Sequence, residues 1–215
     1  MQTDKAAPFI QIPYYLYFPK SSCLNTDLLL KTLRARVIVP DEEYREYFAM
    51  HELRQFKKGE HIFRQGDIPR YSIFILKGCM RNYYIGLEGI ERITYFSEEG
   101  YWAGDLECMR KQEPTVQNLQ VLENTHVLTV SRENWEIAYH KFSWLSAIHA
   151  IGQQRRAAKL TEHIGKLLTD TPEVNYQRLL KERPALILRV PQHYIASYLG
   201  ITPETLSRIR KKMSL

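Results

Sequence analysis

Between residues 53 and 130 the chain consists of short β-rich runs separated by glycine-containing breaks. β-Branched and aromatic residues are frequent in the runs at 72–76, 80–85, 90–96 and 125–130. Glycine supplies the positive φ angles that tight turns need, so its recurrence marks the ends of strands. Short strands with turn signals about every 8–12 residues are typical of a β-sandwich or β-barrel. The pattern predicts such a core for the middle of the chain.

Helical patterns precede the β region. Apolar residues have helical spacing over 26–36 and 41–50, and three acidic residues follow Pro40, where a helix N-terminus favours negative charge. Residues 1–25 are rich in tyrosine and proline, and we expect them to form an irregular arm. The chain therefore combines helices with a β core.

Helices return after the last β run. Ser131 is a candidate N-cap, and apolar residues at three- and four-residue spacing predict one long helix over 143–169. These residues are Leu145, Ile148, Ile151, Ala158, Ile164, Leu167 and Leu168. Glutamine and arginine interrupt the series, which leaves a weak coiled-coil seam. The pattern then predicts a helix over 172–182 and a short strand over 187–190.

The segment 192–211, QHYIASYLGITPETLSRIRK, has the pattern of a helix-turn-helix. The apolar positions that two packed helices require are Ile195, Leu199, Leu206 and Ile209. Ala196 is small where the helices cross, and Gly200 stands at the turn, where the backbone needs a left-handed conformation. Thr202 can cap the second helix, and Pro203 suits its first turn. Because all these positions agree in one register, they predict a helix-turn-helix.

The second helix of such a motif presents its N-terminal half to base edges when it lies in the DNA major groove. The candidate DNA-binding residues are Thr202, Pro203, Glu204, Thr205, Ser207, Arg208, Lys211 and Lys212. Arg208 can form two hydrogen bonds to guanine, and Glu204 can accept one from cytosine. Lys211 and Lys212 suit phosphate contacts. Alternatively, Glu204 is only an acid favoured by the helix dipole, and the basic residues are solvated charges.

Charge is distributed unevenly along the chain. Residues 1–150 contain 18 Lys+Arg and 19 Asp+Glu, whereas residues 151–215 contain 12 and 5. The last third therefore has a net charge of +7, against −1 for the rest. This surplus favours a polyanionic partner, first nucleic acid and second a membrane surface. The alternative is a solvated basic helix face.

Motifs typical of several other protein classes do not occur. No apolar stretch approaches 18 residues, so we expect no membrane span. The three cysteines are far apart and odd in number, which suits a reducing cytoplasm and neither a disulfide framework nor a metal cluster. Glycine-rich phosphate loops, GxSxG and HExxH are missing, so we expect no enzyme.

Three motifs together resemble the Crp/Fnr family of bacterial transcription regulators: KKGEHIFRQGD, FILKG and RVPQHYIASYLGITPETLSRIRKK. The resemblance spans about residues 30–213. It implies an α+β chain with a cyclic-nucleotide-binding-like β-roll over 26–142, a dimerisation helix over 143–170 and a helix-turn-helix DNA-binding domain over 171–215. It also implies a homodimer that binds palindromic double-stranded DNA and contacts RNA polymerase.

In this family an E-x-x-S-R recognition helix contacts the half-site, and the matching residues here are Glu204, Ser207 and Arg208. The match is to the oxygen-sensing branch, whose half-sites resemble TTGAT. That branch has an N-terminal cysteine cluster, which this sequence lacks. Only two residues follow Met213, so we expect the β-hairpin wing that usually follows the recognition helix to be absent.

The effector site of the family has an altered form in this sequence. Cyclic-AMP binders have Gly-Glu-Leu, followed further along the chain by Arg-Ser. Here the first part is Gly104-Asp105-Leu106, and the second falls on Pro114-Thr115 or Thr115-Val116. A buried cyclic phosphate without its cation is costly, so we expect no cyclic-AMP dependence. The candidate effector-binding residues are Gly104, Asp105, Leu106 and Thr115; the effector is unknown, and no cofactor is expected.

Two functions remain open. The first is a DNA-binding transcription regulator, with or without a small-molecule effector. The second is a small-molecule-sensing module whose helix-turn-helix makes only protein contacts. The basic run at 208–212 favours the first. Several strand aromatics can line a ligand pocket, although their spacing favours the core: Tyr83, Tyr84, Tyr95, Phe96, Tyr101 and Trp102.

Overall fold

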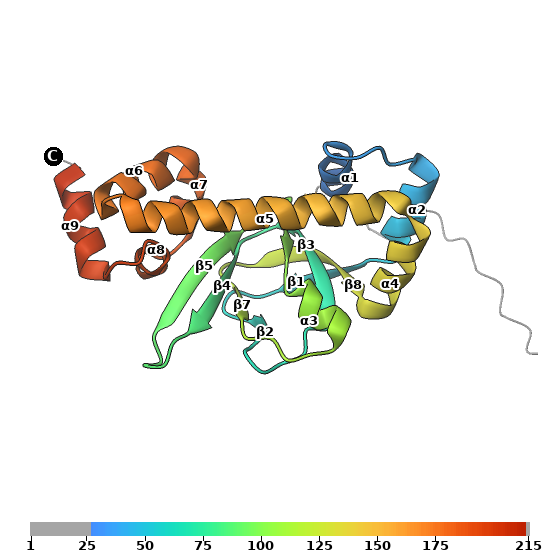
Figure 1. Ribbon diagram of the computed structural model, residues 1–215, viewed down its shortest axis with the longest axis horizontal. Coiled ribbons are helices and arrows are strands. Elements are labelled where there is room, and N and C mark those ends of the chain that lie inside the picture. The colour runs from blue at the N-terminus through green and yellow to red at the C-terminus, as the bar shows by residue number, and fades with distance from the viewer. Residues whose placement is uncertain (1–26, 214–215) are drawn as a thin grey trace, which may run out of the picture.

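The computed structural model describes residues 27–213; the arm expected over 1–25, and the chain after Met213 where no wing is expected, lie outside this range. Figure 1 shows a β-roll beside one long helix, with shorter helices gathered at both ends of that helix. The helices are α1 (Asp27–Arg34), α2 (Asp41–Ala49), α3 (Leu106–Lys111), α4 (Arg132–Lys141), α5 (Ser143–Thr169), α6 (Pro172–Glu182), α7 (Pro184–Arg189), α8 (Gln192–Tyr198) and α9 (Pro203–Met213). The strands are β1 (Glu52–Phe56), β2 (His61–Phe63), β3 (Tyr71–Lys77), β4 (Met80–Ile85), β5 (Glu91–Ser97), β6 (Trp102–Ala103), β7 (Asn118–Val121) and β8 (Thr125–Ser131).

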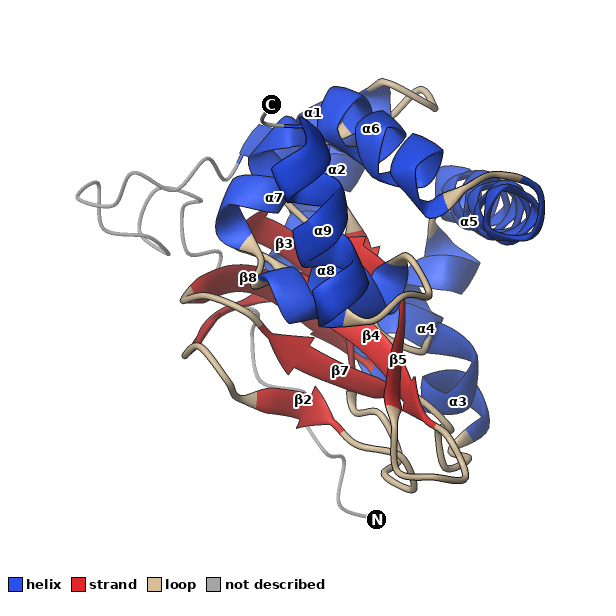
Figure 2. Ribbon diagram, turned by 90° about the vertical axis from the view of Figure 1, so that its left-hand side faces the viewer, coloured by secondary structure: helices blue, strands red, loops and turns tan. Residues whose placement is uncertain are grey.

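The described strands form two antiparallel sheets, with the orders β1-β8-β3-β6 and β2-β7-β4-β5. Five consecutive residues of β3 are buried. Since successive side chains point to opposite sides of a strand, β3 is covered on both faces. Ile73 and Ile75 pack into the core between the sheets, whereas Phe74 and Leu76 pack against helices. Figure 2 shows the sheets with helices beside them. The predicted β core and the α+β class are confirmed.

The turn between β3 and β4 shows why the motif FILKG ends in glycine. Gly78 has a φ of +123°, and a Cβ at this position would overlap the Thr125 side chain. The Gly78 N–H donates to Glu99 Oε1 at 2.8 Å, so the turn is also tied to the loop after β5. A residue with a side chain here would therefore meet both strained backbone and a steric clash.

Helices α1, α2 and α4 and the start of α5 form an apolar cluster with the outer face of β3. The Tyr47 ring packs edge-on against Phe142 and Trp144, with centroid distances of 6.1 and 5.1 Å. Leu145 and Ile148 belong to the same cluster and are 4 % and 5 % exposed. The first turns of α5 are therefore part of the core of the protomer.

The rest of α5, which matches the predicted helix over 143–169, leaves this core. Residues 152–162 are exposed along their whole length. Leu160, Ile164 and Leu168 are 42 %, 48 % and 81 % exposed, and their four-residue spacing places them on one face of the helix. The apolar residues at the start of α5 therefore belong to the core of the protomer, whereas those at its end lie on the surface. Within residues 27–213, no helix is both long and apolar enough to cross a membrane.

The short strand predicted over 187–190 is wrong, because most of this segment belongs to helix α7. Pro184 stands in the first helical turn, where its missing N–H leaves no helical hydrogen bond unmade. Leu186 is fully buried, whereas Leu188 is 88 % exposed. A run of four apolar and basic residues is too short for its periodicity to separate strand from helix. Packing among α6, α8 and α9 decides in favour of the helix.

Candidate functional site

The turn between α8 and α9 has the geometry that the sequence predicts. Gly200 has a φ of +69°, and the Ile201 N–H donates to the Ala196 carbonyl at 3.0 Å. The Thr202 hydroxyl accepts the Thr205 N–H at 3.2 Å and so caps α9. The residues predicted to pack between the helices are all buried: Ile195, Ala196, Leu199, Leu206 and Ile209. The predicted helix-turn-helix is confirmed as a fold.

The outer face of α9 is polar and accessible. Its exposed residues are Thr202, Pro203, Glu204, Ser207, Arg208, Lys211 and Lys212. Glu204 and Arg208 are one turn apart and therefore share a face. Thr205 is half-buried, with its hydroxyl 3.2 Å from that of Thr202 and 3.3 Å from Arg208 Nη2. Thr205 is thus part of the helix cap, and it is less accessible than its neighbours.

Glu204 also has the local role of an acid in the first turn of a helix. Hydrogen bonds from its own backbone N–H and from the Thr202 hydroxyl lower the pKa of its carboxyl group. The carboxylate is therefore ionised at neutral pH. Because a carboxylate has about four acceptor positions, capping leaves Glu204 able to accept a hydrogen bond from a base.

The predicted effector residues lie at the start of α3. Gly104 has a φ of +111°, and Leu106 begins the helix. Asp105 caps α3 by accepting the Cys108 N–H at 3.2 Å, and its other carboxylate oxygen accepts the Thr115 hydroxyl at 2.8 Å. Thr115 is only 1 % exposed. The structure therefore brings Asp105 and Thr115 together by a direct hydrogen bond.

Further residues that no sequence motif marks join this polar network. Gln117 donates to Asp105 Oδ2 at 3.3 Å and accepts from Asn82 Nδ2 at 3.0 Å. Asn82 Nδ2 also contacts the Tyr95 hydroxyl. Arg156 of α5 donates to the same hydroxyl, and its guanidinium carbon lies 4.4 Å from the centre of the Tyr95 ring. Strands β4 and β5, the segment before β7 and helix α5 are thereby linked.

The polar network contains one cationic group, the guanidinium of Arg156, and one anionic group, the carboxylate of Asp105. Arg156 donates to the Gly104 carbonyl at 3.4 Å, next to the Asp105 carboxylate in the chain. Burial raises the pKa of Tyr95 to about 12, so its hydroxyl stays protonated at neutral pH. Asn82 is 0 % exposed, and its Oδ1 has no hydrogen-bond partner among the described residues. Since buried polar atoms are usually paired, this oxygen is a candidate acceptor for a small polar ligand.

The aromatic residues of the strands divide between core and surface. Tyr83 and Phe96 are each 4 % exposed and contact the helical domain through one apolar cluster. Tyr84 and Tyr101 are 37 % and 48 % exposed, so the expectation that they belong to the core is wrong. Tyr84 is the penultimate residue of β4, and Tyr101 directly precedes β6. Tyr95 belongs to the polar network.

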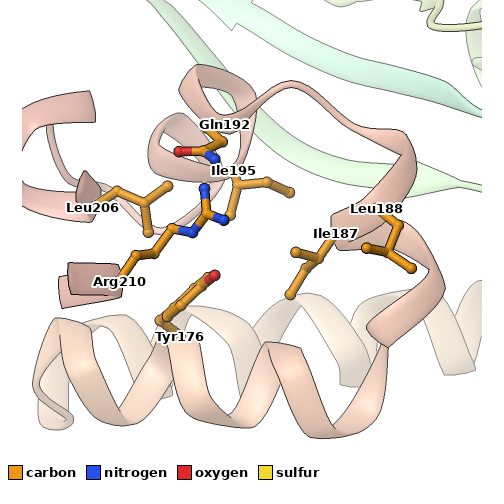
Figure 3. A pocket seen from close by; sticks show the side chains of 7 residues that line it. All are labelled: Tyr176, Ile187, Leu188, Gln192, Ile195, Leu206 and Arg210. Atoms are coloured by element: carbon orange, nitrogen blue, oxygen red, sulfur yellow. The ribbon is translucent and has the colours of Figure 1, made fainter. Parts of the chain in front are cut away.

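A small cavity lies between α6, α7, α8 and α9 (Figure 3). Its volume is about 70 Å³, and Ile195 and Leu206 contribute apolar walls. The polar ends of Gln192 and Arg210 lie near each other across it. Pockets for small-molecule ligands usually have volumes of about 300–1,000 Å³. This cavity is too small for a nucleotide, and we assign no effector site to it.

Comparison with known proteins agrees with this architecture. Residues 53–141 match the cyclic nucleotide-binding domain family. The probable transcriptional regulator flp of Lacticaseibacillus casei is 25 % identical over 199 residues, which are 90 % of this chain and 87 % of that protein. The structure of FixK2 from Bradyrhizobium japonicum is similar with a TM-score of 0.67 and 20 % identity, covering 76 % of this chain and 84 % of FixK2. The c-di-GMP-responsive global regulator CLP of Xanthomonas campestris has a TM-score of 0.66 and 17 % identity, covering 81 % and 92 %.

These findings define the class as a cyclic nucleotide-binding domain followed by a long helix and a helix-turn-helix domain. The domain match, the similarity to a probable transcriptional regulator and the shared fold agree with the resemblance to the Crp/Fnr family that the three motifs indicated.

Proposed function

We propose that this chain is a homodimeric transcription regulator that binds a palindromic DNA operator with TTGAT-like half-sites. The observation that carries the proposal is the exposed face of α9, on which Glu204, Ser207 and Arg208 lie. A guanidinium fork matches the two acceptors of guanine, and a carboxylate matches the amino group of cytosine. The basic end of α9 adds charges suited to the phosphates on either side.

The α5 stripe, which we define as Ala150, Ala157, Leu160, Ile164 and Leu168, supports the homodimer. All five residues are exposed, and they are separated by seven, three, four and four positions. Two copies of such a face can pack around a two-fold axis, with close approach at the alanines and interlocking side chains at the larger residues. The two α9 helices of this dimer then face two half-sites related by the same symmetry.

A transcription regulator of this kind also implies a cellular location and a protein partner. We place the regulator in the cytoplasm, with RNA polymerase as a protein partner and no catalytic activity of its own. The relative flp is named as a transcriptional regulator, which supports a role in transcription. The polar network around Asp105 and Asn82 supports an additional small-molecule effector, with Gly104, Leu106 and Thr115 nearby.

The proposal is tested by replacing one residue suited to base contact and one suited to phosphate contact. Arg208→Ala should weaken specific binding by about 1–3 kcal/mol per half-site and relax the preference for one guanine. Lys212→Ala should weaken binding to all sequences alike, because a phosphate contact carries no sequence information. Selection of binding sites from a randomised DNA pool, performed with both variants, measures the two effects.

The two variants are matched because each removes one exposed cation from α9. An unchanged consensus with Arg208→Ala would reduce Arg208 to a phosphate contact and remove the main support for a TTGAT-like half-site. Absence of DNA binding by the unmodified chain would favour the second function, in which the helix-turn-helix contacts only protein.

We propose that cyclic AMP is not the effector. Pro114 or Thr115 stands where the family has a cation, and neither is charged. Thr115 donates to Asp105, whose negative charge would face a cyclic phosphate. Arg156 is the cation of this network, and it is engaged with Tyr95 and Gly104. Isothermal calorimetry should therefore detect no binding of cyclic AMP at micromolar concentrations. Micromolar affinity that disappears in Arg156→Ala would instead make Arg156 the phosphate ligand.

A further inference from the structure

The helical domain formed by α6–α9 packs against β4 and the edge strand β5 of the β-roll (Figure 1). One buried apolar cluster spans the contact, with Tyr83, Ile93 and Phe96 from the roll and Leu179, Leu186 and Ile195 from the helices. Apolar contacts stabilise an interface but have little directional preference, whereas surrounding polar contacts fix its geometry. The orientation of α9 relative to the roll therefore depends on the polar groups around this cluster.

The first polar contact is made by Arg81 of β4. Its side chain is 3 % exposed, and its guanidinium carbon lies 4.1 Å from the ring centre of Tyr83 and 4.0 Å from that of Tyr194 in α8. Glu91 forms an ion pair with Arg81, and Gln120 accepts from Arg81 Nε at 2.8 Å. A planar cation held between two rings in this way determines where α8 lies.

The second contact joins α8 to the edge of the sheet. The Ser197 hydroxyl donates to the Glu91 carbonyl at 2.9 Å and accepts the Ile93 N–H at 3.1 Å. An edge strand has backbone groups that lack a neighbouring strand. Ser197 satisfies one donor and one acceptor of β5, which both anchors α8 and covers part of the exposed edge.

The third contact is made by Arg189 at the end of α7. Its guanidinium forms a two-pronged interaction with Glu99, at 2.8 and 3.0 Å, and it also contacts Glu123. The hydrogen bond to Glu99, followed by that to Glu123, raises the pKa of Arg189 although burial opposes the shift. The side chain is 24 % exposed, so solvent screens this pair only in part.

The surface of α9 suited to DNA takes no part in the docking. Leu206 and Ile209 face the apolar cluster, whereas Glu204, Ser207 and Arg208 on the opposite side are exposed. The docked arrangement therefore leaves the recognition residues accessible. Contacts that held the domain in an inactive orientation by masking its DNA surface would instead cover these residues.

We propose that three contacts, Arg81 with Tyr194, Ser197 with β5, and Arg189 with Glu99, form an interdomain clamp that orients the helix-turn-helix for DNA before DNA is bound. This inference rests on the proposed function, because it concerns the same recognition helix. In a dimer, the two recognition helices must reach major grooves about 34 Å apart. A domain that moves freely must be ordered when both half-sites are occupied, and this ordering lowers affinity. With the clamp, the domain is already ordered before DNA binds, so this loss of affinity is avoided.

The docking can be measured without DNA through the Ile93 amide, whose hydrogen bond comes from α8 and not from the roll. Amide hydrogen exchange of the full chain should be at least about 10-fold faster at Ile93 in Ser197→Ala and in the double variant Tyr194→Leu/Arg189→Gln, because a lost hydrogen bond exposes this donor. Tyr194→Phe retains the ring and should preserve slow exchange. Arg54→Gln is the control at a distant site. It removes a comparable cation, whose guanidinium carbon lies 4.2 Å from the ring centre of Tyr71 in β3.

DNA binding then tests the consequence of the docking. The double variant should lose about 10-fold or more in affinity for a palindromic duplex but keep its affinity for a duplex with one half-site. Unchanged exchange at Ile93, a gain in palindrome affinity, or equal losses on both duplexes would each overturn the clamp. If the unmodified chain binds neither duplex, the proposed function fails, whereas the exchange data still decide whether the domain is docked.

Ser197→Ala is the control for folding. It keeps the apolar contacts of α8 intact and so distinguishes loss of the clamp from loss of folding.

Discussion

The affinity of the dimer for its operator should fall by about 10³- to 10⁵-fold when salt rises from 50 to 200 mM, if about 6–10 phosphates are contacted. Arg208, Lys211 and Lys212 are exposed on α9 of each protomer. Because Arg208 is assigned to a base, Lys211 and Lys212 of the two protomers supply four of these phosphate contacts, and the others must come from further groups such as backbone N–H groups and helix N-termini. Each neutralised phosphate releases counterions, and this release is what added salt opposes.

Several of the other cations in the last third of the chain have structural partners. Arg178 pairs with Asp170, Arg183 with Glu98, and Arg189 with Glu99. The net charge of +7 over 151–215 thus overstates the charge available for phosphate contacts, although the exposed cations of α9 remain.

Fluorescence anisotropy with a labelled operator at several salt concentrations measures this prediction. Lys212→Ala should reduce the slope of log affinity against log salt by about 0.9 for each protomer. Lys111→Ala removes one charge from α3, where Lys111 pairs with Glu107, and should leave the slope unchanged. A salt response that is flat for the unmodified protein would contradict DNA binding through phosphates.

The double variant Leu160→Asp/Ile164→Asp should convert the dimer to a monomer and reduce palindrome affinity by at least about 100-fold. The two residues lie on the α5 stripe and are 42 % and 48 % exposed in the protomer, so the substitution leaves the core of each protomer intact. Four carboxylates facing one another across a two-fold axis repel and must be desolvated. Loss of the second protomer then removes the gain in affinity, about 10²–10⁴-fold, that linked binding sites provide.

Sedimentation at micromolar concentration gives the oligomeric state, and anisotropy gives the affinity. Ile137→Asp is the matched control, because Ile137 is 55 % exposed on α4 and lies outside the stripe. This control should remain dimeric. A stable dimer of the double variant would move the dimer interface away from α5.

The local parts of the recognition domain could be predicted from the sequence because their geometry depends on neighbouring residues. Gly200 has the left-handed conformation expected at the turn, and Thr202 caps α9 as predicted. Helix α5 runs from Ser143 to Thr169, as its apolar spacing indicated. In each case the deciding interactions span only a few positions, so a pattern in the chain contains the information.

The segment at 187–190 shows where local patterns fail. Its apolar residues suit a strand, yet it continues the helix that starts at Pro184. The same limit applies to α5, where Leu145 and Leu160 look alike in the sequence. Leu145 is 4 % exposed because α2 and α4 cover it, whereas Leu160 has no such cover. Burial is a property of what packs against a helix, and spacing alone does not reveal it.

By itself the sequence determined the β core, the long helix, the helix-turn-helix and the accessible residues of α9, because turn chemistry and hydrophobic periodicity act over short distances. Only the tertiary structure decided which distant side chains meet. Arg156 reaches Tyr95 across 61 positions, and Arg189 reaches Glu99 across 90. Such contacts depend on how the roll, α5 and the helical domain are placed in three dimensions. The polar network around Asp105 and Asn82, and the contacts of the proposed interdomain clamp, could therefore be found only in the folded chain.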